Sequence, residues 1–303
     1  MNSLPPGFSI GHWTDPVART GCTVILCPPR TVGGCDVRGA SPGSRELALL
    51  QSEKKMDEIH ALVLTGGSAF GLAAADGVMK FLEERSIGYK TPWARVPIVP
   101  AAVVFDLNVG SSTSRPDAQS GYAAADAARA EGIPEGTVGA GTGTMVGKWA
   151  GLEYAMHGGF GLVYVKRDHW SVAAAAVVNC VGDVVDAKGN VLSGARDAEG
   201  AWLASRDPSR SMHRGVAILP ANTVLVALLT DAALTKVDAN RISQRAHDGI
   251  ARAVRPAHTS FDGDVVFCAA AGSLGYDLDA IAESAAEGTE QAIRRAVLIS
   301  WGK

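Results

Sequence analysis

The feature that most constrains the fold is a run of eight almost wholly apolar residues, from Thr223 to Thr230. A strand that faces water on one side alternates apolar and polar side chains, whereas this run presents apolar side chains to both sides. The run therefore predicts a strand that is covered by protein on both faces. Such a strand belongs in a layered structure, because each face of its sheet must be buried against another element.

The rest of the chain predicts further strands and helices in a mixed order. Strands are expected at 22–27, 60–64, 170–178 and 261–271, a hairpin at 182–192, and helices at about 72–84, 120–131, 234–254 and 278–300. Residues 33–43 and 135–151 are rich in glycine and are expected to form loops, and 196–215 is expected to be an exposed connector. The residues alone thus indicate an α/β or α+β fold.

Composition excludes several classes of protein. Of the 303 residues, 47% are hydrophobic and 19% are charged, which are values of a globular chain rather than a disordered one. The formal net charge of −3 lacks the basic excess that non-specific nucleic-acid binding requires. The 35 glycines indicate tight turns and close approach of backbones.

The cysteine pattern and the length of the apolar segments indicate the compartment in which the protein is expected. The five cysteines are odd in number and form no C-x-x-C pair, so free buried thiols are expected rather than disulfides or a zinc site. The first residues lack the basic and apolar regions of a signal peptide, and no apolar stretch reaches 18 residues. A soluble cytoplasmic protein without membrane contact is expected.

Two glycine-rich loops invite a nucleotide-binding interpretation, but neither fits a known motif. In the loop from Gly66 to Gly71, Ser68 stands where a dinucleotide fingerprint needs glycine, and Phe70 stands where a nucleophile elbow needs it. In the loop around Lys148, Thr142 and Trp149 replace residues that a Walker motif requires. Close backbone packing is the favoured interpretation of both loops.

Six short motifs follow one another in an order that resembles a known family. They are Leu64-Thr65-Gly66-Gly67-Ser68-Ala69-Phe70-Gly71-Leu72, Phe105-Asp106-Leu107-Asn108, Gly139-Ala140-Gly141-Thr142-Gly143 with Gly147-Lys148, Val178-Asn179 with Gly182, Asn222-Thr223, and Phe261-Asp262-Gly263-Asp264. Together they resemble the self-processing family of L-aminopeptidase/D-esterase, β-peptidyl aminopeptidases and nylon-oligomer hydrolase. The resemblance extends from about residue 7 to the C-terminus.

The resemblance implies a four-layer αββα sandwich like that of N-terminal-nucleophile hydrolases, and a precursor that cuts itself. The cut maps to the bond between Asn222 and Thr223. A single hydrolase domain over 1–303 would become an α-chain, 1–222, and a β-chain, 223–303, of 81 residues. Thr223 would then be the N-terminal nucleophile. A hydroxyl needs a base, and the new α-amine, with a pKa of about 7.7–8.0, lies on the same residue.

Four further residues match functional positions of the family. Asp262 and Asp264 match an acidic pair beside the nucleophile, and residues i and i+2 of a strand face the same way; the alternative is a solvated Asp-Gly-Asp turn. Lys148 matches a lysine of the active-site loop, and the alternative is a surface lysine. Asn179 matches an asparagine suited to donate an amide N–H to an oxyanion, and the alternative is a turn residue at a strand end.

One position departs from the family. Phe105 stands where some members have a tyrosine proposed to help stabilise the oxyanion, so another donor must act here or the activity differs. Phe105 is therefore not among the predicted catalytic residues.

The function expected is hydrolysis of amide bonds, as an aminopeptidase acting on small peptides, amides or oligomers of β- or ω-amino acids. No cofactor and no metal are expected. The expected partners are the small substrate, the two chains of one precursor, and further copies in a tetramer-like homo-oligomer. Two alternatives stay open: an acyltransferase of the ornithine acetyltransferase type, which shares the layering and self-cleavage at threonine, and a binding protein without catalysis.

Overall fold

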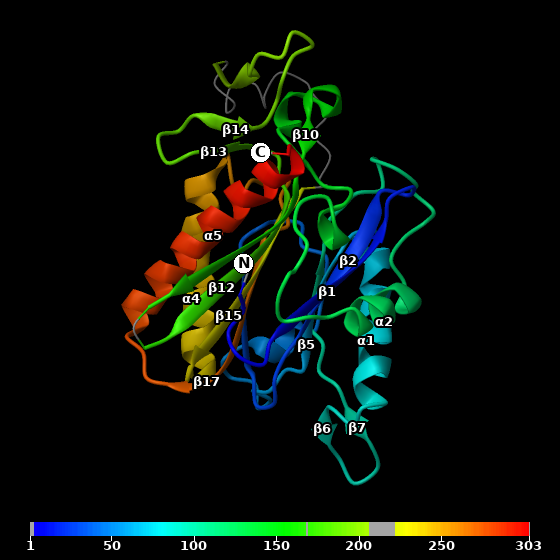
Figure 1. Ribbon diagram of the computed structural model, residues 1–303, viewed down its shortest axis with the longest axis vertical. Helices are drawn as coiled ribbons and strands as arrows, with labels where there is room; N and C mark the ends of the chain where they lie inside the picture. Colours follow the sequence, from blue (N-terminus) through cyan, green and yellow to red (C-terminus); the bar gives the residue numbers. More distant parts are fainter. Residues whose placement is uncertain (1–2, 168, 206–221, 303) are drawn as a thin grey trace.

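Two five-stranded sheets form the centre of the molecule (Figure 1). The computed structural model describes residues 3–167, 169–205 and 222–302. The first sheet has the order β1 (Ser9–Asp15), β2 (Thr20–Leu26), β5 (Ala61–Thr65), β8 (Ala101–Val103) and β4 (Ser44–Arg45). The second has the order β11 (Gly159–Lys166), β12 (Ser171–Asn179), β15 (Thr223–Ala232), β17 (Val265–Leu274) and β3 (Val32–Val37). Within them, β5–β8 and β15–β17 are the parallel pairs.

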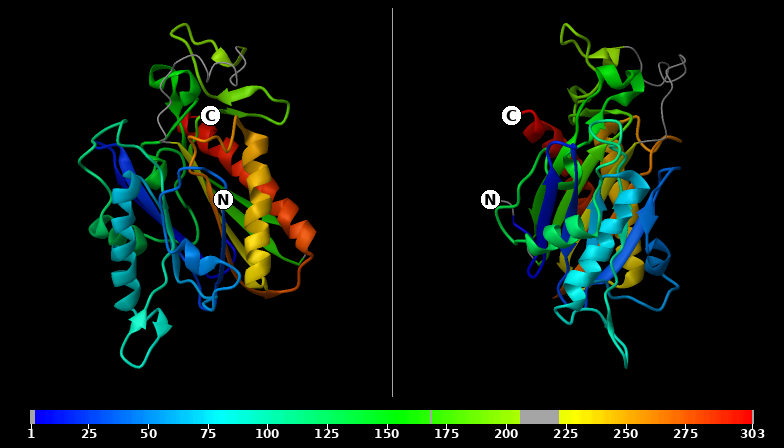
Figure 2. Two further views of the ribbon diagram at one scale, coloured as in Figure 1. Left: turned by 180° about the vertical axis from the view of Figure 1, so that it is seen from behind. Right: turned by 90° about the vertical axis from the view of Figure 1, so that its right-hand side faces the viewer.

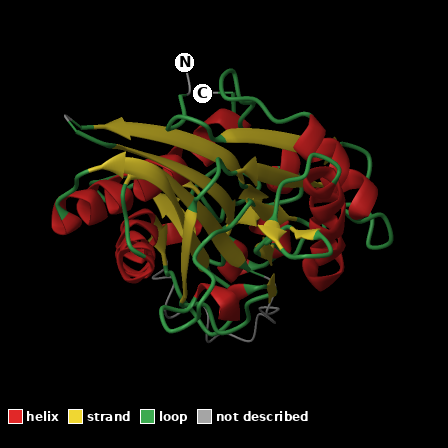
Figure 3. Cartoon of the chain, turned by 90° about the horizontal axis from the view of Figure 1, so that it is seen from below, coloured by secondary structure: helices red, strands yellow, loops and turns green. Residues whose placement is uncertain are grey.

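Helices cover the outer face of each sheet (Figures 2 and 3). Helices α1 (Ala74–Glu83) and α2 (Ala118–Asp126) pack on the first sheet, and α4 (Lys236–Ala253) and α5 (Leu278–Ser300) pack on the second. The layers therefore run helix, sheet, sheet, helix, which confirms the predicted αββα sandwich.

The apolar run of β15 explains how the layers are held together. Leu225, Ala227 and Leu229 belong to the core between the two sheets, together with side chains of β2, β5 and β12. The alternate residues Val224 and Val226 belong to the core under α4 and α5. The strand is thus buried on both faces, as its sequence predicts.

Local signals fix the two helices that follow β15. The side chain of Thr235 accepts a hydrogen bond from the Asp238 amide at the start of α4, and Asp277 caps α5 in the same way. Helix α4 ends at Ala253, three residues before Pro256, which agrees with the expected end.

The expected loop at 33–43 is wrong over its first part, because β3 occupies Val32–Val37 and pairs with β17 at the sheet edge. Its glycines serve close packing rather than a turn. A Cβ atom on Gly34 would lie 2.6 Å from the backbone of Ala239 in α4. The expected connector at 196–215 is described only up to residue 205.

Small sheets extend the frame at both ends. At one end, β13 (Asp183–Val185) pairs with β14 (Val191–Ser193) and β16 (Val254–Arg255), and β9 (Met145–Val146) pairs with β10 (Met156–His157). At the other end, β6 (Tyr89–Lys90) and β7 (Arg95–Val96) form a hairpin. All five cysteines are free thiols. Among the described residues, no helix combines the length and apolarity needed to cross a membrane.

Candidate active site

The bond between Asn222 and Thr223 lies where β15 begins, in the middle of the second sheet. Thr223 stands opposite Asn179, the last residue of β12, and Asn222 forms an isolated parallel bridge with Asp262. The exposed fractions of Asn222 and Thr223 are 4% and 5%. The bond is therefore enclosed between the end of β12 on one side and the segment that leads into β17 on the other.

Two donors converge on the carbonyl oxygen of Asn222. The Thr223 hydroxyl Oγ1 donates to it at 2.5 Å, and the backbone N–H of Gly263 donates to it at 2.7 Å. A hydroxyl at this distance from the oxygen lies at most about 3.7 Å from the carbonyl carbon, given a C=O bond of about 1.23 Å. The hydroxyl is thus within reach of the carbonyl carbon while an amide N–H holds the oxygen.

Gly263 can approach the bond because it has no side chain. A Cβ atom at this position would lie 2.6 Å from the carbonyl oxygen of Ser41 and 2.9 Å from Oγ1 of Thr223. Both distances are shorter than van der Waals contact. Glycine between the two aspartates is therefore what lets this amide reach the carbonyl of Asn222.

The acidic pair is buried on the same side. Asp262 and Asp264 are each 1% exposed, which excludes a solvated turn. Oδ2 of Asp262 accepts from the amide at 2.9 Å and the hydroxyl at 2.6 Å of Thr259, and Oδ1 of Asp264 accepts from the Val224 amide at 2.7 Å. The pair lies in the extended segment just before β17 rather than within the strand.

Burial makes one of these carboxyl groups easy to protonate. Burial, and after it the negative charge of Asp264, raise the pKa of Asp262 to about 6, although hydrogen bonds from Thr259 and Val181 oppose this. A group that changes its protonation state near neutral pH suits acid–base chemistry.

Lys148 and Asn179 form the opposite wall. Lys148 follows β9 in a short 3-10 turn (Lys148–Ala150), and its Nζ donates to both the backbone oxygen of Asn179, at 2.8 Å, and its Oδ1, at 3.0 Å. Oδ1 of Asn179 also accepts from the Met145 amide. Lys148 is 8% exposed, so it is not a surface lysine. Burial lowers its pKa to about 7, against the opposing effects of Cys180 and Asp262.

The side-chain amide of Asn179 contacts Phe105, the residue that stands where some members of the family have a tyrosine. Its Nδ2 donates to the backbone oxygen of Phe105 at 3.0 Å. The residue that lacks the tyrosine hydroxyl thus contributes its carbonyl to orienting Asn179. On the carbonyl oxygen of Asn222, the backbone donor is the Gly263 amide.

Two components of the site were not found from the sequence. The first is the Gly263 amide, for which the glycine between two acids was the available signal. The second is His258, whose Nδ1 lies 2.6 Å from Oδ2 of Asp264. This histidine lies in the loop before the acidic pair, and nothing in its sequence neighbourhood distinguishes it, because the contact depends on how the loop folds back.

The loop from Gly66 to Gly71 is explained by packing. The Gly67 amide donates to Oδ1 of buried Asp106 at 2.7 Å, and the Thr20 hydroxyl donates to Oδ2 at 2.7 Å. A Cβ atom on Gly66 would lie 2.1 Å from that carboxylate. The glycines thus let the backbone close around Asp106, which agrees with the packing interpretation.

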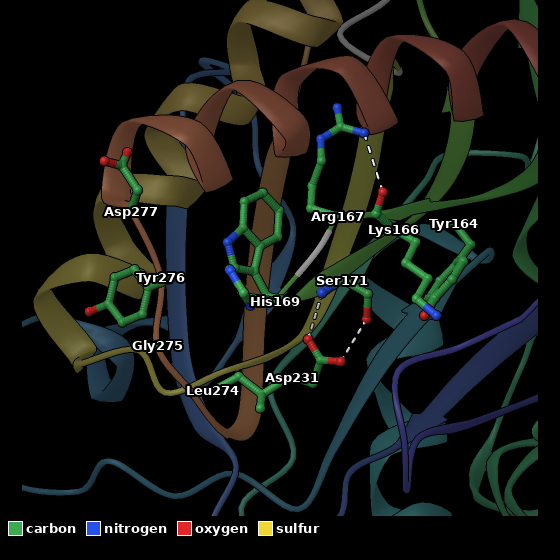
Figure 4. Close-up of a pocket in the computed structure, with 11 residues that line it drawn as sticks. Tyr164, Lys166, Arg167, His169, Ser171, Asp231, Leu274, Gly275, Tyr276 and Asp277 are labelled. Atoms are coloured by element: carbon green, nitrogen blue, oxygen red, sulfur yellow. Dashed lines mark hydrogen bonds between the residues drawn. The ribbon is translucent and has the colours of Figure 1, made fainter.

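A cavity of about 720 Å³ lies at the opposite end of the second sheet (Figure 4). Its wall includes Ser171, the first residue of β12, whose amide and hydroxyl both bond to Asp231. Since β12 spans nine residues, this cavity is about 25–30 Å from Thr223. It is therefore separate from the site at Thr223. No group of three or more histidine, cysteine or acidic residues in the described part of the chain is arranged to hold a metal.

Comparison with known proteins agrees with this fold. The structure of L-aminopeptidase D-Ala-esterase/amidase from Ochrobactrum anthropi, described as a variant of the Ntn hydrolase fold, matches with a TM-score of 0.75 at 17% identity, over 99% of this chain and 86% of that one. A Burkholderia sp. β-aminopeptidase matches with a TM-score of 0.70 at 21% identity, over 97% and 86% of the two chains.

Sequence comparison gives the family. Peptidase family S58 matches residues 6–301. A Mycobacterium leprae protein named as an uncharacterized aminopeptidase is 42% identical over 293 residues, covering 90% of this chain and 80% of that one. The 6-aminohexanoate-oligomer endohydrolase of Kocuria sp. is 31% identical over 270 residues, covering 86% and 72%.

Fold and relatives together define a hydrolase with an N-terminal-nucleophile type of fold. More narrowly, the chain belongs to peptidase family S58.

Proposed function

We propose that this chain cuts its own bond between Asn222 and Thr223 and that Thr223 then acts as the nucleophile of an amide hydrolase. One observation carries the proposal: the Thr223 hydroxyl and the Gly263 amide both contact the carbonyl oxygen of Asn222. A nucleophile and an oxyanion donor thus meet at one peptide bond, which is what acyl transfer requires.

Self-cleavage proceeds in two steps. The hydroxyl oxygen of Thr223 attacks the carbonyl carbon of Asn222, and the Gly263 amide stabilises the negative charge that develops on the oxygen. The C–N bond then breaks, the nitrogen takes up the proton that the hydroxyl has given up and becomes the amine of Thr223, and an ester joins the two residues. Water hydrolyses this ester, which leaves a carboxylate on Asn222 and restores the hydroxyl.

The processed site repeats this chemistry on a substrate. The neutral fraction of the new amine accepts the hydroxyl proton, directly or through water, as the hydroxyl attacks the substrate carbonyl. The leaving amine takes up a proton, and water releases the acyl group from Thr223. Asn179 and Lys148 line one side of this nucleophile, and Asp262 and Asp264 line the other.

The charges of the site favour substrates with a free amino group. Two carboxyl groups beside the nucleophile stabilise an ammonium group of the substrate, because opposite charges attract strongly in a buried site. The nucleophile then meets the first amide bond, so the substrate class is short peptides, amides and β- or ω-amino-acid oligomers. The names of the relatives, an aminopeptidase and an aminohexanoate-oligomer hydrolase, support this class.

The first experiment tests self-cleavage. Purified protein on a denaturing gel is expected to give two bands, and N-terminal sequencing of the smaller band is expected to begin Thr-Val-Leu-Val. Thr223→Ala is expected to give one full-length band, whereas Thr223→Ser, which keeps a hydroxyl, is expected to be cut. Active wild-type protein that remains one full-length band would contradict the proposal.

The second experiment tests the reaction. Hydrolysis of short amino-terminal amides is expected to slow sharply when the substrate amine is acetylated, and to be insensitive to a chelator. Equal rates on free and acetylated substrates would exclude an aminopeptidase. Transfer of the acyl group to an added amine in preference to water would identify an acyltransferase instead.

Assembly is a separate part of the proposal, and it rests on the family resemblance. The processed chains are proposed to stay together and to form a homo-oligomer of the tetramer type. Light scattering of the purified protein is expected to give about four times the mass of one chain, and the mass of a single chain would contradict this.

A further inference from the structure

His258 has an acceptor in contact with each of its ring nitrogens. Nδ1 lies 2.6 Å from Oδ2 of Asp264, and Nε2 lies 3.5 Å from the backbone oxygen of His247. A neutral imidazole carries one N–H and can donate to one of these acceptors, whereas the imidazolium can donate to both. The side chain is 19% exposed, so its contact with Asp264 is largely shielded from water.

The two carboxyl groups of the acidic pair therefore differ in their partners. Asp264 has the His258 ring on one oxygen and the Val224 amide on the other. Among the described residues, the hydrogen-bond partners of Asp262 are the hydroxyl and amide of Thr259 and the Val181 amide, which are all neutral. Each of these buried carboxylates raises the cost of ionising the other, and the ring in contact with Asp264 favours the charge on that carboxyl. Lys148 is a second cation that acts on Asp262, and its hydrogen bonds to Asn179 hold its Nζ in the opposite wall of the site.

Other charged groups near His258 also affect its pKa, but the pKa stays above the ordinary value of a histidine. His247 packs against His258 edge to face, with ring centroids 4.8 Å apart, and burial together with the charge of His258 lowers the pKa of His247 to about 4, so it is neutral near pH 7. Arg38 repels the imidazolium, but it is paired with Asp36 at 3.0 Å. Burial alone would lower the pKa of His258, yet the contact with Asp264 outweighs it and raises that pKa.

We propose that His258 is a positioning residue: its imidazolium pairs with the Asp264 carboxylate, so that Asp262 is the member of the acidic pair that takes up a proton as the pH falls. This deepens the proposed function, on which its catalytic meaning rests, by naming the acid that titrates in the working range. Because the pKa of His258 is raised above its ordinary value, its charge is present at low pH and is lost as the pH rises through this raised pKa.

The decisive experiment reads protonation directly and needs no turnover. The protein is the uncut Thr223→Ala precursor with ¹³C-labelled aspartate carboxyls and histidine rings, titrated by NMR from pH 4.5 to 8.5. Asp262 is expected to titrate near pH 6 and to be the member of the pair that takes up the proton. Adding His258→Gln, which keeps an N–H donor but has no charge, is expected to move the titration of the pair upward by about one pH unit.

Two further variants complete the test. Adding Asp264→Asn to the same precursor is expected to lower the pKa of His258 by at least one unit, whereas the exposed His157→Gln control is expected to change neither titration. An Asp264 carboxyl that titrates in place of Asp262, or a pair that is unaffected by His258→Gln, would overturn the proposal.

A rate measurement then links the assignment to function. In wild-type protein the acid limb of the pH profile of self-cleavage is expected to follow Asp262, and His258→Gln is expected to move this limb to higher pH, with the two rates converging above about pH 8. A limb that does not move would overturn the positioning role. A wild-type chain that is never cut would refute the proposed function, and the NMR titration would still decide the protonation of the pair.

Discussion

Replacing Gly263 with alanine tests the oxyanion donor with a single added methyl group. The new Cβ atom would lie 2.6 Å from the Ser41 carbonyl oxygen, which belongs to backbone and cannot rotate away. Restoring an ordinary contact of 3.4 Å requires a movement of about 0.8 Å. The same atom would crowd Oγ1 of Thr223 at 2.9 Å, so the segment must move away from the bond between Asn222 and Thr223, where the cut is proposed.

The expected effect follows from the hydrogen bond that this movement stretches. The Gly263 amide lies 2.7 Å from the Asn222 oxygen, and a displacement of this size brings the pair to the limit of hydrogen bonding. Loss of one oxyanion donor costs about 10²–10³-fold in rate. Self-cleavage is therefore expected to slow by about two orders of magnitude, while crowding costs about 1–3 kcal/mol of stability.

The assay follows cleavage during cell-free synthesis, with samples denatured at intervals and the two products separated on a gel. Gly275→Ala is the matched control, because a Cβ atom there meets nothing within 4 Å. It is expected to be cut at the wild-type rate. Circular dichroism and a melting curve verify that the Gly263→Ala precursor is folded. A folded Gly263→Ala precursor that is cut within threefold of the wild-type rate would refute the role of this amide.

Three other substitutions have defined outcomes. Asp264→Asn keeps an oxygen for the Val224 amide but removes the charge, so turnover is expected to fall by about 10²-fold with the circular dichroism spectrum unchanged. Lys148→Met removes both hydrogen bonds to Asn179 and is expected to lower kcat at least tenfold, measured on processed protein, whereas an unchanged kcat would make Lys148 structural. Burial raises the pKa of Asp183 to about 6, and its Oδ2 has no hydrogen-bond partner among the described residues. Folding therefore favours the protonated carboxyl. The stability that this group contributes is fully present below about pH 4 and is lost as the pH rises through 6. Asp183→Asn is therefore expected to raise the free energy of unfolding at pH 8 by at most about 3 kcal/mol and to have little effect at pH 4, measured by urea denaturation at both pH values.

Elements with a strong local pattern were predicted well from the sequence. The strand that begins at Thr223 and the helices α4 and α5 have continuous apolar or amphipathic sequence and clear ends, and the structure places them within a few residues of expectation. By contrast, β3 was missed because its glycines are typical of a loop. They are there because α4 packs against them, which depends on residues about 200 positions away.

Some components of the candidate site were likewise predicted from the sequence, and others were not. Asn179, Lys148 and the two aspartates were found because they lie in short motifs shared with a family, and the structure brings them around Thr223 from three separate segments. The roles of these side chains stay predictions until the variants are measured. Every residue except proline has a backbone N–H, so the sequence does not show that the N–H of Gly263 contacts Asn222. The contact between His258 and Asp264 depends on how a loop folds. Such features become visible only in three dimensions.

The order of strands in the second sheet bears on when the proposed cut can occur during the life of the chain. In that order, β15 and β17 lie between β12 and β3, so the segment after the cut supplies the middle of a sheet whose neighbours on both sides come from the segment before it. Its strand β15 is also buried on both faces, between the two cores. A separately made 81-residue piece would have to insert two strands into a gap in a sheet that cannot close without them. In the proposed self-cleavage, folding must therefore come before cutting, and the appearance of the new terminus would report that a given molecule has already reached its native topology.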